Sequence, residues 1–310
     1  MMADPEPKLL VVAHDAGGAE IISAWLRRHL DEWDAALAVA GPAKAIFARK
    51  LDVALPQFDG VPPLEGVSFV LCGSSASAQL ERQAVRASRA AGVRCAVWLD
   101  HWTNYRARFI ADGDVVLPDE VWVSDEYAAA IARAELPGAD IRLHHNQYLE
   151  DFAGEVRSLD AADAPDRANG GEPERILYVT EPIAASAELA TGDPGGWGYN
   201  EFDALARYLD HLVRRDGARA ELRLRTHPSE SPEKYSELLG PTAAVAIQHS
   251  PPGATLAEDV AWADTVVGCD TMAMAAALAA GRRVISMLSV GTGGVTLPHA
   301  QIERPFRSVG

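Results

Sequence analysis

The chain has 310 residues, enough for two domains of about 150 residues each. Its hydrophobic content of 48% is ordinary for a globular protein, and no apolar run approaches the roughly 20 residues of a membrane helix. The formal charge of −16 argues against general binding to nucleic acids or anionic membranes, because like charges repel over long range. A small anionic ligand can still be held by local N–H groups, His and Arg.

The N-terminus and the cysteines predict a cytoplasmic protein. Residues 1–8 are acidic and contain proline, without the basic and apolar regions of a secretory signal. Cys72, Cys95 and Cys269 are far apart, so neither a disulfide framework nor a Cys-x-x-Cys metal site is indicated. We expect no metal and no transmembrane segment.

The first half of the chain alternates strand and helix patterns. Residues 8–13 are predicted as a buried strand, and apolar residues spaced for one helix face follow from about 19 to 30. A long helix is expected over 77–91, ended by Gly92. Further strands are expected at 35–39, 67–72, 93–99 and 120–124. This order predicts a parallel sheet with crossover helices.

The second half repeats this alternation after a change in composition. Residues 151–174 are acidic and rich in Ala, Gly and Pro, which predicts a linker between an N-terminal domain, 1–150, and a C-terminal domain, 175–310. Helices are expected over 202–213, with Gly217 as the stop, and over 272–280. Strands are expected at 175–180, 221–226, 243–248, 265–268 and 283–288. The predicted fold class is therefore α/β, with two Rossmann-like domains whose parallel sheets face each other across a cleft.

A polar, glycine-containing loop joins the first strand to the first helix, where open α/β sheets expose their ligand crevice. It contains His14, Asp15, Gly17 and Gly18, and it has neither the GxGxxG nor the P-loop pattern. We expect the glycines to let the backbone approach a substrate. Asp15 is the first candidate for a general base toward a hydroxyl, and His14 is the second. The alternative is that Asp15 only caps the helix and the glycines only make a tight turn.

A second polar cluster follows the strand at 93–99. Asp100, His101 and Tyr105, together with Trp102, suit a sugar or another polyol, so we expect them on the acceptor or substrate side. The alternative is a buried Asp–His pair with the two aromatic residues in an interdomain core.

Two short motifs in the second half predict phosphate binding. In Thr226-His227-Pro228 the proline keeps His227 out of helical geometry, so its ring can face the crevice and stabilise a leaving phosphate. Asp270, Thr271 and Met272 stand between a strand and an apolar helix, so the Thr271 hydroxyl and nearby N–H groups would cradle a phosphate. The alternatives are a histidine that satisfies a loop carbonyl and simple N-capping by Asp270 or Thr271.

Three other features leave their roles open. Arg106 and Arg108 could meet an anionic substrate, although solvated surface arginines are more common. His144 and His145 are adjacent, so on a strand they would point to opposite faces and could not readily bind one metal ion. The loop 180–182 resembles a hinge or a nucleotide-facing loop.

The two halves with these motifs resemble glycosyltransferases of the GT-B class. Thr226-His227-Pro228 and Asp270-Thr271 are especially similar to the His-Pro and Ser/Thr motifs of bacterial sialyltransferases, polysialyltransferases and related capsule-sugar transferases. The resemblance is architectural over most of the chain and reaches the level of motifs only in these two places. The chain lacks the acidic-acidic-Gly triplet of the sialyltransferase pattern, and His14-Asp15-Ala16-Gly17 stands in the comparable position.

The resemblance implies a metal-independent transfer of a sugar, with a nonulosonic acid among the candidates. The donor would be a nucleotide sugar bound mainly by the C-terminal domain, and the acceptor a glycan or lipid-linked molecule bound mainly by the N-terminal one. Asp15 would be the base, and His227 with Thr271 would stabilise the departing phosphate. A nucleotide-sugar hydrolase or 2-epimerase and a non-catalytic nucleotide-sugar-binding protein remain open. No cofactor besides the co-substrate is expected.

Overall fold

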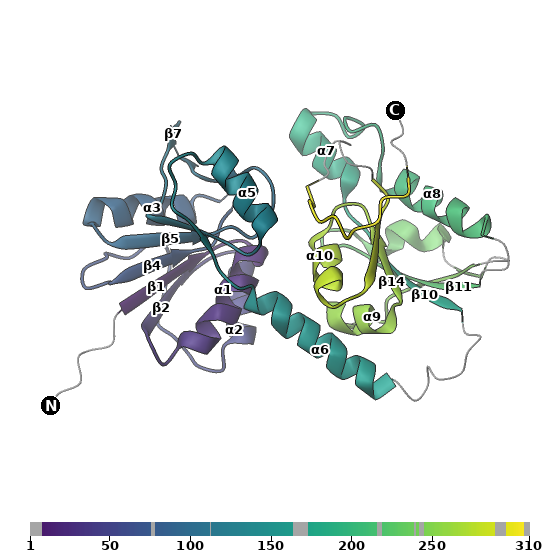
Figure 1. Cartoon of the computed structure of the whole chain (residues 1–310), viewed down its shortest axis with the longest axis horizontal. Helices are drawn as coiled ribbons and strands as arrows, with labels where there is room; N and C mark the ends of the chain where they lie inside the picture. The colour runs from purple at the N-terminus through teal and green to yellow at the C-terminus, as the bar shows by residue number, and fades with distance from the viewer. Residues whose placement is uncertain are drawn as a thin grey trace. The chain divides into compact units, whose positions relative to one another are not determined.

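The chain folds into two compact units, Met1–Tyr148 and Leu149–Gly310 (Figure 1). The computed structural model describes residues 8–75, 78–111, 113–163, 173–215, 219–238, 240–241, 245–288 and 296–306. Among these residues no helix is long and apolar enough to cross a membrane.

The N-terminal unit is built on a seven-stranded parallel sheet with the strand order β3-β2-β1-β4-β5-β8-β9. Because β2 and β3 lie on one side of β1 and β4 lies on the other, the strand order reverses between β1 and β4. Ligands of open α/β sheets bind at the carboxyl ends of the strands at such a point. The strands are β1 (Lys8–Ala13), β2 (Asp34–Val39), β3 (Gln57–Phe58), β4 (Phe69–Cys72), β5 (Arg94–Trp98), β8 (Glu120–Val123) and β9 (Ile141–Leu143), with a separate antiparallel pair β6 (Ile110–Ala111) and β7 (Asp114–Val115).

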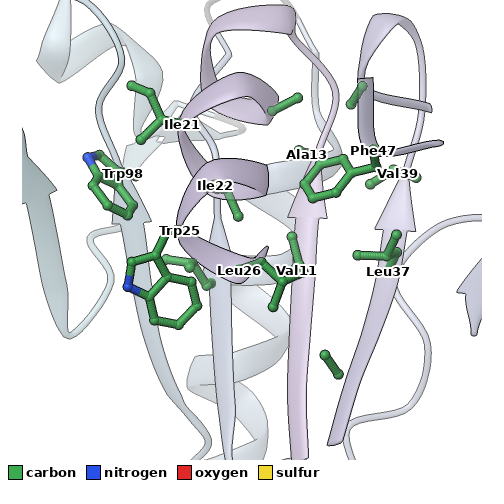
Figure 2. Packing of buried hydrophobic residues seen from close by; sticks show 14 of the residues in the cluster. Val11, Ala13, Ile21, Ile22, Trp25, Leu26, Leu37, Val39, Phe47 and Trp98 are labelled. Atoms are coloured by element: carbon green, nitrogen blue, oxygen red, sulfur yellow. The ribbon is translucent and has the colours of Figure 1, made fainter. Parts of the chain in front are cut away.

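Helices cover both faces of this sheet because its central strands are apolar on both sides. Val11 and Leu37 of the strands belong to one cluster of buried residues with Ile22 and Leu26 of the first helix (Figure 2). The opposite face of β1, β4 and β5 contacts the third helix, which ends at Gly92 with a left-handed φ of 66°. The helices are α1 (Ala16–His29), α2 (Pro42–Lys50), α3 (Leu80–Ala91), α4 (Tyr105–Arg108) and α5 (Glu126–Glu135).

The C-terminal unit has a six-stranded sheet with the order β12-β13-β11-β10-β14-β15, in which only β12 is antiparallel to its neighbour. The strand order reverses between β10 and β14, so the loops after these two strands mark the ligand position expected for this unit. The strands are β10 (Glu174–Val179), β11 (Ala220–Arg225), β12 (Gly240–Pro241), β13 (Val245–His249), β14 (Thr265–Gly268) and β15 (Arg283–Ser286). The helices are α6 (Gln147–Asp163), whose first two residues belong to the N-terminal unit, α7 (Ile183–Thr191), α8 (Glu201–Val213), the 3-10 helix η1 (Pro232–Leu238), α9 (Leu256–Trp262) and α10 (Met272–Ala279).

The predicted α/β class with two Rossmann-like units is confirmed, and the structure describes part of the expected linker. Its first part is helical, since α6 runs through residues 147–163. Phe152, Ala153 and Val156 are buried at helical spacing, and this apolar stripe outweighs the acidic, Ala-rich composition. The rest of the expected linker up to residue 172, and the stop at Gly217, lie outside the described residues.

Candidate functional site

Two glycines bring the loops at the reversal point of the first sheet into close contact. A Cβ atom on Gly18 would lie 3.0 Å from the Cα of Gly73, in the loop after β4. A Cβ atom on Gly17 would lie 1.9 Å from Oδ2 of Asp100, in the loop after β5. These glycines therefore let neighbouring loops approach the backbone closely. The sequence alone predicted that they let a substrate approach.

His14 and Asp15 form a partly exposed hydrogen-bonded pair after β1. The two atoms His14 Nδ1 and Asp15 Oδ1 are 2.7 Å apart, and the side chains are 33% and 36% exposed. Asp15 is the N-cap residue of α1, yet its side chain makes no capping hydrogen bond. The imidazole lies against Gly41, where a Cβ atom would be 2.7 Å from His14 Nε2. The carboxylate is thus oriented by the imidazole and remains open to solvent, as a general base requires.

Asp100 belongs to a buried ion pair. Its Oδ1 accepts hydrogen bonds from Ser74 Oγ at 2.7 Å and from Arg108 Nη1 at 3.1 Å, and Arg108 also donates to Ser74 Oγ at 2.7 Å. The side chains of Asp100 and Arg108 are only 10% and 9% exposed. Removing either partner would leave an uncompensated buried charge. Asp100 therefore ties the loops after β4 and β5 together, and Asp15 is better placed than Asp100 to meet a substrate.

The structure corrects the prediction that Tyr105 lines the acceptor side. Tyr105 is fully buried, and this burial raises the pKa of its phenol above the usual range. Trp102 is also buried and donates its indole N–H to Asp125 at 2.8 Å. The aromatic residues went into the interior because their apolar area outweighs their polar ends. His101 is partly exposed, with its ring centroid 6.0 Å from that of Trp102.

In the C-terminal unit, Thr180 joins the loops after β10 and β11. Its hydroxyl accepts from the His227 main-chain N–H at 3.0 Å and donates to Glu230 Oε2 at 2.7 Å. The imidazole Nδ1 of His227 accepts from the Ser229 main-chain N–H at 3.2 Å and lies 2.7 Å from Ser229 Oγ. Because Nδ1 acts as an acceptor here, Nε2–H is the ring donor available to a ligand.

Glu181, the next residue, joins the loops after β10 and β14. Its Oε1 accepts from the main-chain N–H groups of Cys269 at 3.0 Å and Asp270 at 2.8 Å. Burial raises the pKa of Glu181 to about 7, an effect that exceeds the opposing influence of these N–H groups. Thr271 is the N-cap of α10 and accepts from the Ala273 N–H at 3.3 Å. The loop of His227 and the start of α10 are therefore bonded to adjacent residues at the reversal point of the second sheet.

The structure also corrects the role expected for Asp270. Both oxygens of its carboxylate accept from other parts of the chain: Oδ1 from the Leu297 N–H at 2.9 Å, and Oδ2 from the Thr296 N–H at 2.6 Å and the Thr296 hydroxyl. The side chain thus anchors residues 296–297, and a carboxylate would repel a phosphate in any case. Of the remaining predicted residues, Thr226 is partly exposed, Pro228 is exposed and Met272 begins α10.

Sequence reasoning missed Glu81 and gave no chemical role to Glu181. Glu81 shares the buried face of α3 with Ala84, Val85 and Ser88, a helical spacing that identifies an inward-facing carboxyl. Glu181 follows a strand in the loop that the sequence interpretation treated as a hinge or nucleotide-facing segment. No local pattern shows which main-chain groups either carboxyl binds.

Within the described ranges, no group of three or more His, Cys, Asp or Glu residues could hold a metal ion. His144 stacks on Trp122 with ring centroids 3.8 Å apart. Its burial lowers its pKa, which is typical of a packed histidine.

Comparisons with known proteins find similar solved structures. No family model matches the chain, and neither does any curated protein. Among solved structures, the chain is similar to the MnaA–UDP co-structure from S. aureus, with 11% identity, a TM-score of 0.57 and coverage of 91% of this chain and 79% of that chain. It is also similar to UDP-GlcNAc 2-epimerase from Methanocaldococcus jannaschii, with 10% identity, a TM-score of 0.56 and coverage of 90% and 83%. For MurG from Acinetobacter baumannii the identity is 11%, the TM-score 0.52 and the coverage 90% and 78%. At these identities the likeness shows a GT-B-type fold of two parallel-sheet α/β units.

Proposed function

We propose that the chain is an enzyme that binds a nucleotide sugar in its C-terminal unit and transfers the sugar to a hydroxyl acceptor without a metal ion. The observation that supports this most is the arrangement after β10, where Thr180 holds the His227 loop and Glu181 holds the loop before α10. An imidazole N–H donor and the amino end of a buried helix both favour the negative charge of a phosphate.

The chemistry assigned to these groups is a nucleophilic displacement at the anomeric carbon of the sugar. Asp15 takes the proton of the acceptor hydroxyl, and the acceptor oxygen forms a bond to that carbon. The bond from the anomeric carbon to the phosphate oxygen breaks, and the electron pair leaves with the nucleotide. His227 Nε2–H and the amino end of α10 stabilise the charge on that phosphate. His14 orients the base through the 2.7 Å contact with Asp15.

The base and the sugar of the donor are not specified in this proposal. The His-Pro resemblance favours a CMP-linked nonulosonic acid, whereas several structural neighbours are bound to UDP or UDP-GlcNAc. A panel of CMP, UDP and GDP sugars therefore belongs in the first assay.

A second candidate is a nucleotide-sugar 2-epimerase, favoured by the likeness to a solved UDP-GlcNAc 2-epimerase. A hydrolase would use the same donor site with water as the acceptor, and a binding protein would use it without turnover. Products separate these candidates: a transferase releases nucleotide only with an acceptor, an epimerase forms a C2 epimer without one, and a hydrolase releases free sugar.

The test combines ligand screening with product analysis by NMR. A bound nucleotide sugar at 100 times its dissociation constant stabilises the folded protein by about 2.7 kcal/mol, which a thermal-shift screen detects. Stabilisation with no product under any acceptor condition would leave the binding protein as the remaining candidate. No stabilisation by any nucleotide or nucleotide sugar would refute nucleotide-sugar binding itself.

Two substitutions test the assigned residues. Asp15→Asn should lower kcat by about 10²–10⁴-fold with donor binding retained, because a general base is lost. His227→Ala should lower kcat by about 10²-fold, because a donor to the developing charge is lost. Asp31→Asn, at an exposed position after α1, is the matched control and should keep the wild-type rate. Wild-type rates in both site variants would remove the proposed mechanism.

A further inference from the structure

A buried carboxyl stands behind the His14–Asp15 pair, and none of the predicted motifs contains it. Glu81 lies in the first turn of α3 and is only 4% exposed. It points inward with Ala84 and Val85 on the buried face of that helix. Burying a carboxyl costs free energy unless hydrogen bonds compensate, so its contacts indicate what it does.

One oxygen of Glu81 holds the main chain at the proposed base. Glu81 Oε1 accepts from the His14 main-chain N–H at 2.7 Å, a contact between residues 67 positions apart. His14 is the first residue after β1 and directly precedes Asp15. The hydrogen bond therefore fixes the backbone from which both side chains of the pair extend.

The other oxygen, Oε2, is buried and has no hydrogen-bond partner among the residues that the structure describes. Glu81 lines a small cavity of about 10 Å³ together with Ser74, Ser75, Arg82 and Arg108. A volume of this size holds about one water molecule. Within the described parts of the chain only Oε1 is thus hydrogen-bonded, and that oxygen binds the loop of the proposed base.

Charged and titratable groups reach Glu81 from several elements. His14 and Asp15 face it from the loop after β1, Cys72 from β4, Arg82 from α3 and Arg108 from α4. Arg108 is engaged by Asp100, and Arg82 donates to the carbonyls of Ser75 and Arg108. Burial raises the pKa of Glu81 and the charge of Asp15 raises it further, whereas the main-chain N–H groups of Glu81 itself and of His14 oppose both.

We propose that Glu81 is a positioning residue that, by holding the His14 main chain, keeps the Asp15 carboxylate in the orientation needed to accept a proton. This inference rests on the proposed role of Asp15 as the base. A carboxylate accepts a stronger hydrogen bond than a carboxylic acid does, so protonation of Glu81 loosens the loop. Protonation of Glu81 should therefore contribute to the fall in kcat as the pH is lowered. This fall should begin at a higher pH than protonation of an exposed glutamate would give.

The test uses Glu81→Ala and Glu81→Gln in the full chain, with Glu65→Ala at an exposed position as the control. Glu81→Ala should lower kcat about tenfold, with the KM for the donor nearly unchanged, because about one hydrogen bond that positions the base is lost. Glu81→Gln keeps an oxygen acceptor for His14 and cannot ionise in this range. It should therefore restore part of the rate, because a neutral oxygen accepts a weaker hydrogen bond than a carboxylate does, and lose the part of the acidic limb that belongs to Glu81.

Hydrogen exchange at the His14 amide provides a readout that is independent of turnover. Glu81→Ala should speed exchange at this amide about tenfold more than at amides of β1, whereas Glu81→Gln and Glu65→Ala should not. A wild-type kcat in Glu81→Ala, or an acidic limb in Glu81→Gln that matches the wild type, would overturn the inference. Equal acceleration across the whole N-terminal unit would also overturn it, since Glu81 would then serve only the fold. If no nucleotide sugar is turned over at all, the proposed function fails, and the His14 exchange still decides whether Glu81 holds the pair.

Discussion

Replacing Glu181 with glutamine should remove a pH-dependent cost to the stability of the C-terminal unit. The pKa of this carboxyl rises from its ordinary value of 4.5 to about 7 in the folded chain. The folded chain thus favours the protonated carboxyl. The stability that the protonated Glu181 contributes is complete below pH 4.5 and is lost as the pH rises through about 7. Each unit of difference in pKa corresponds to about 1.4 kcal/mol, so the unfolding free energy falls by at most about 3 kcal/mol. Because Glu181 is partly exposed, solvent screening makes this an upper limit.

Glutamine at this position keeps an oxygen that can accept from the Cys269 and Asp270 N–H groups, and it does not titrate. The difference in unfolding free energy between Glu181→Gln and the wild type should therefore move in favour of the variant by up to about 3 kcal/mol between pH 4.5 and pH 8.5. Urea titrations at both pH values, read by hydrogen exchange on peptides that cover β10 and β11, report this unit separately. A difference that stays constant with pH would refute the reasoning. A difference that moves in favour of the wild type would show that the N–H groups lower the pKa of the carboxyl more than burial raises it.

Two further substitutions test the packing and charge arguments. Gly17→Ala should destabilise the N-terminal unit by about 1–3 kcal/mol in thermal unfolding, because the new Cβ would lie 1.9 Å from Oδ2 of Asp100. Gly154→Ala in helix α6 is the control, and its stability should be unchanged or slightly higher than that of the wild type. Asp259→Asn should cost about 3–5 kcal/mol in chemical unfolding, because the fully buried carboxylate pairs with two arginines at 2.6 and 3.6 Å. The exposed Asp210→Asn should change the unfolding free energy by less than about 0.5 kcal/mol, and a similar value for both aspartates would contradict the buried-pair argument.

The chain's local patterns were sufficient for the fold class and for the position of the loops that follow the strands. The expected strand at 8–13 and the one at 265–268 match β1 and β14, because a buried strand and its flanking turn residues are recorded in consecutive positions. The same holds for the helix that ends at Gly92, whose left-handed backbone favours glycine. The acidic, Ala-rich composition of residues 151–163 predicts a linker, whereas the spacing of a few apolar residues there forms helix α6.

The sequence by itself therefore determined two α/β units and the loops in which their polar motifs stand, since both depend on local periodicity. Only the tertiary structure decided which groups those motifs meet. Glu181 binds amides 88 and 89 positions away, and Asp270 binds residues 26 and 27 positions away. Tyr105 is buried although its neighbours in sequence are polar. Partners at such separations are set by how strands and helices pack in space, and no short stretch of sequence records that packing.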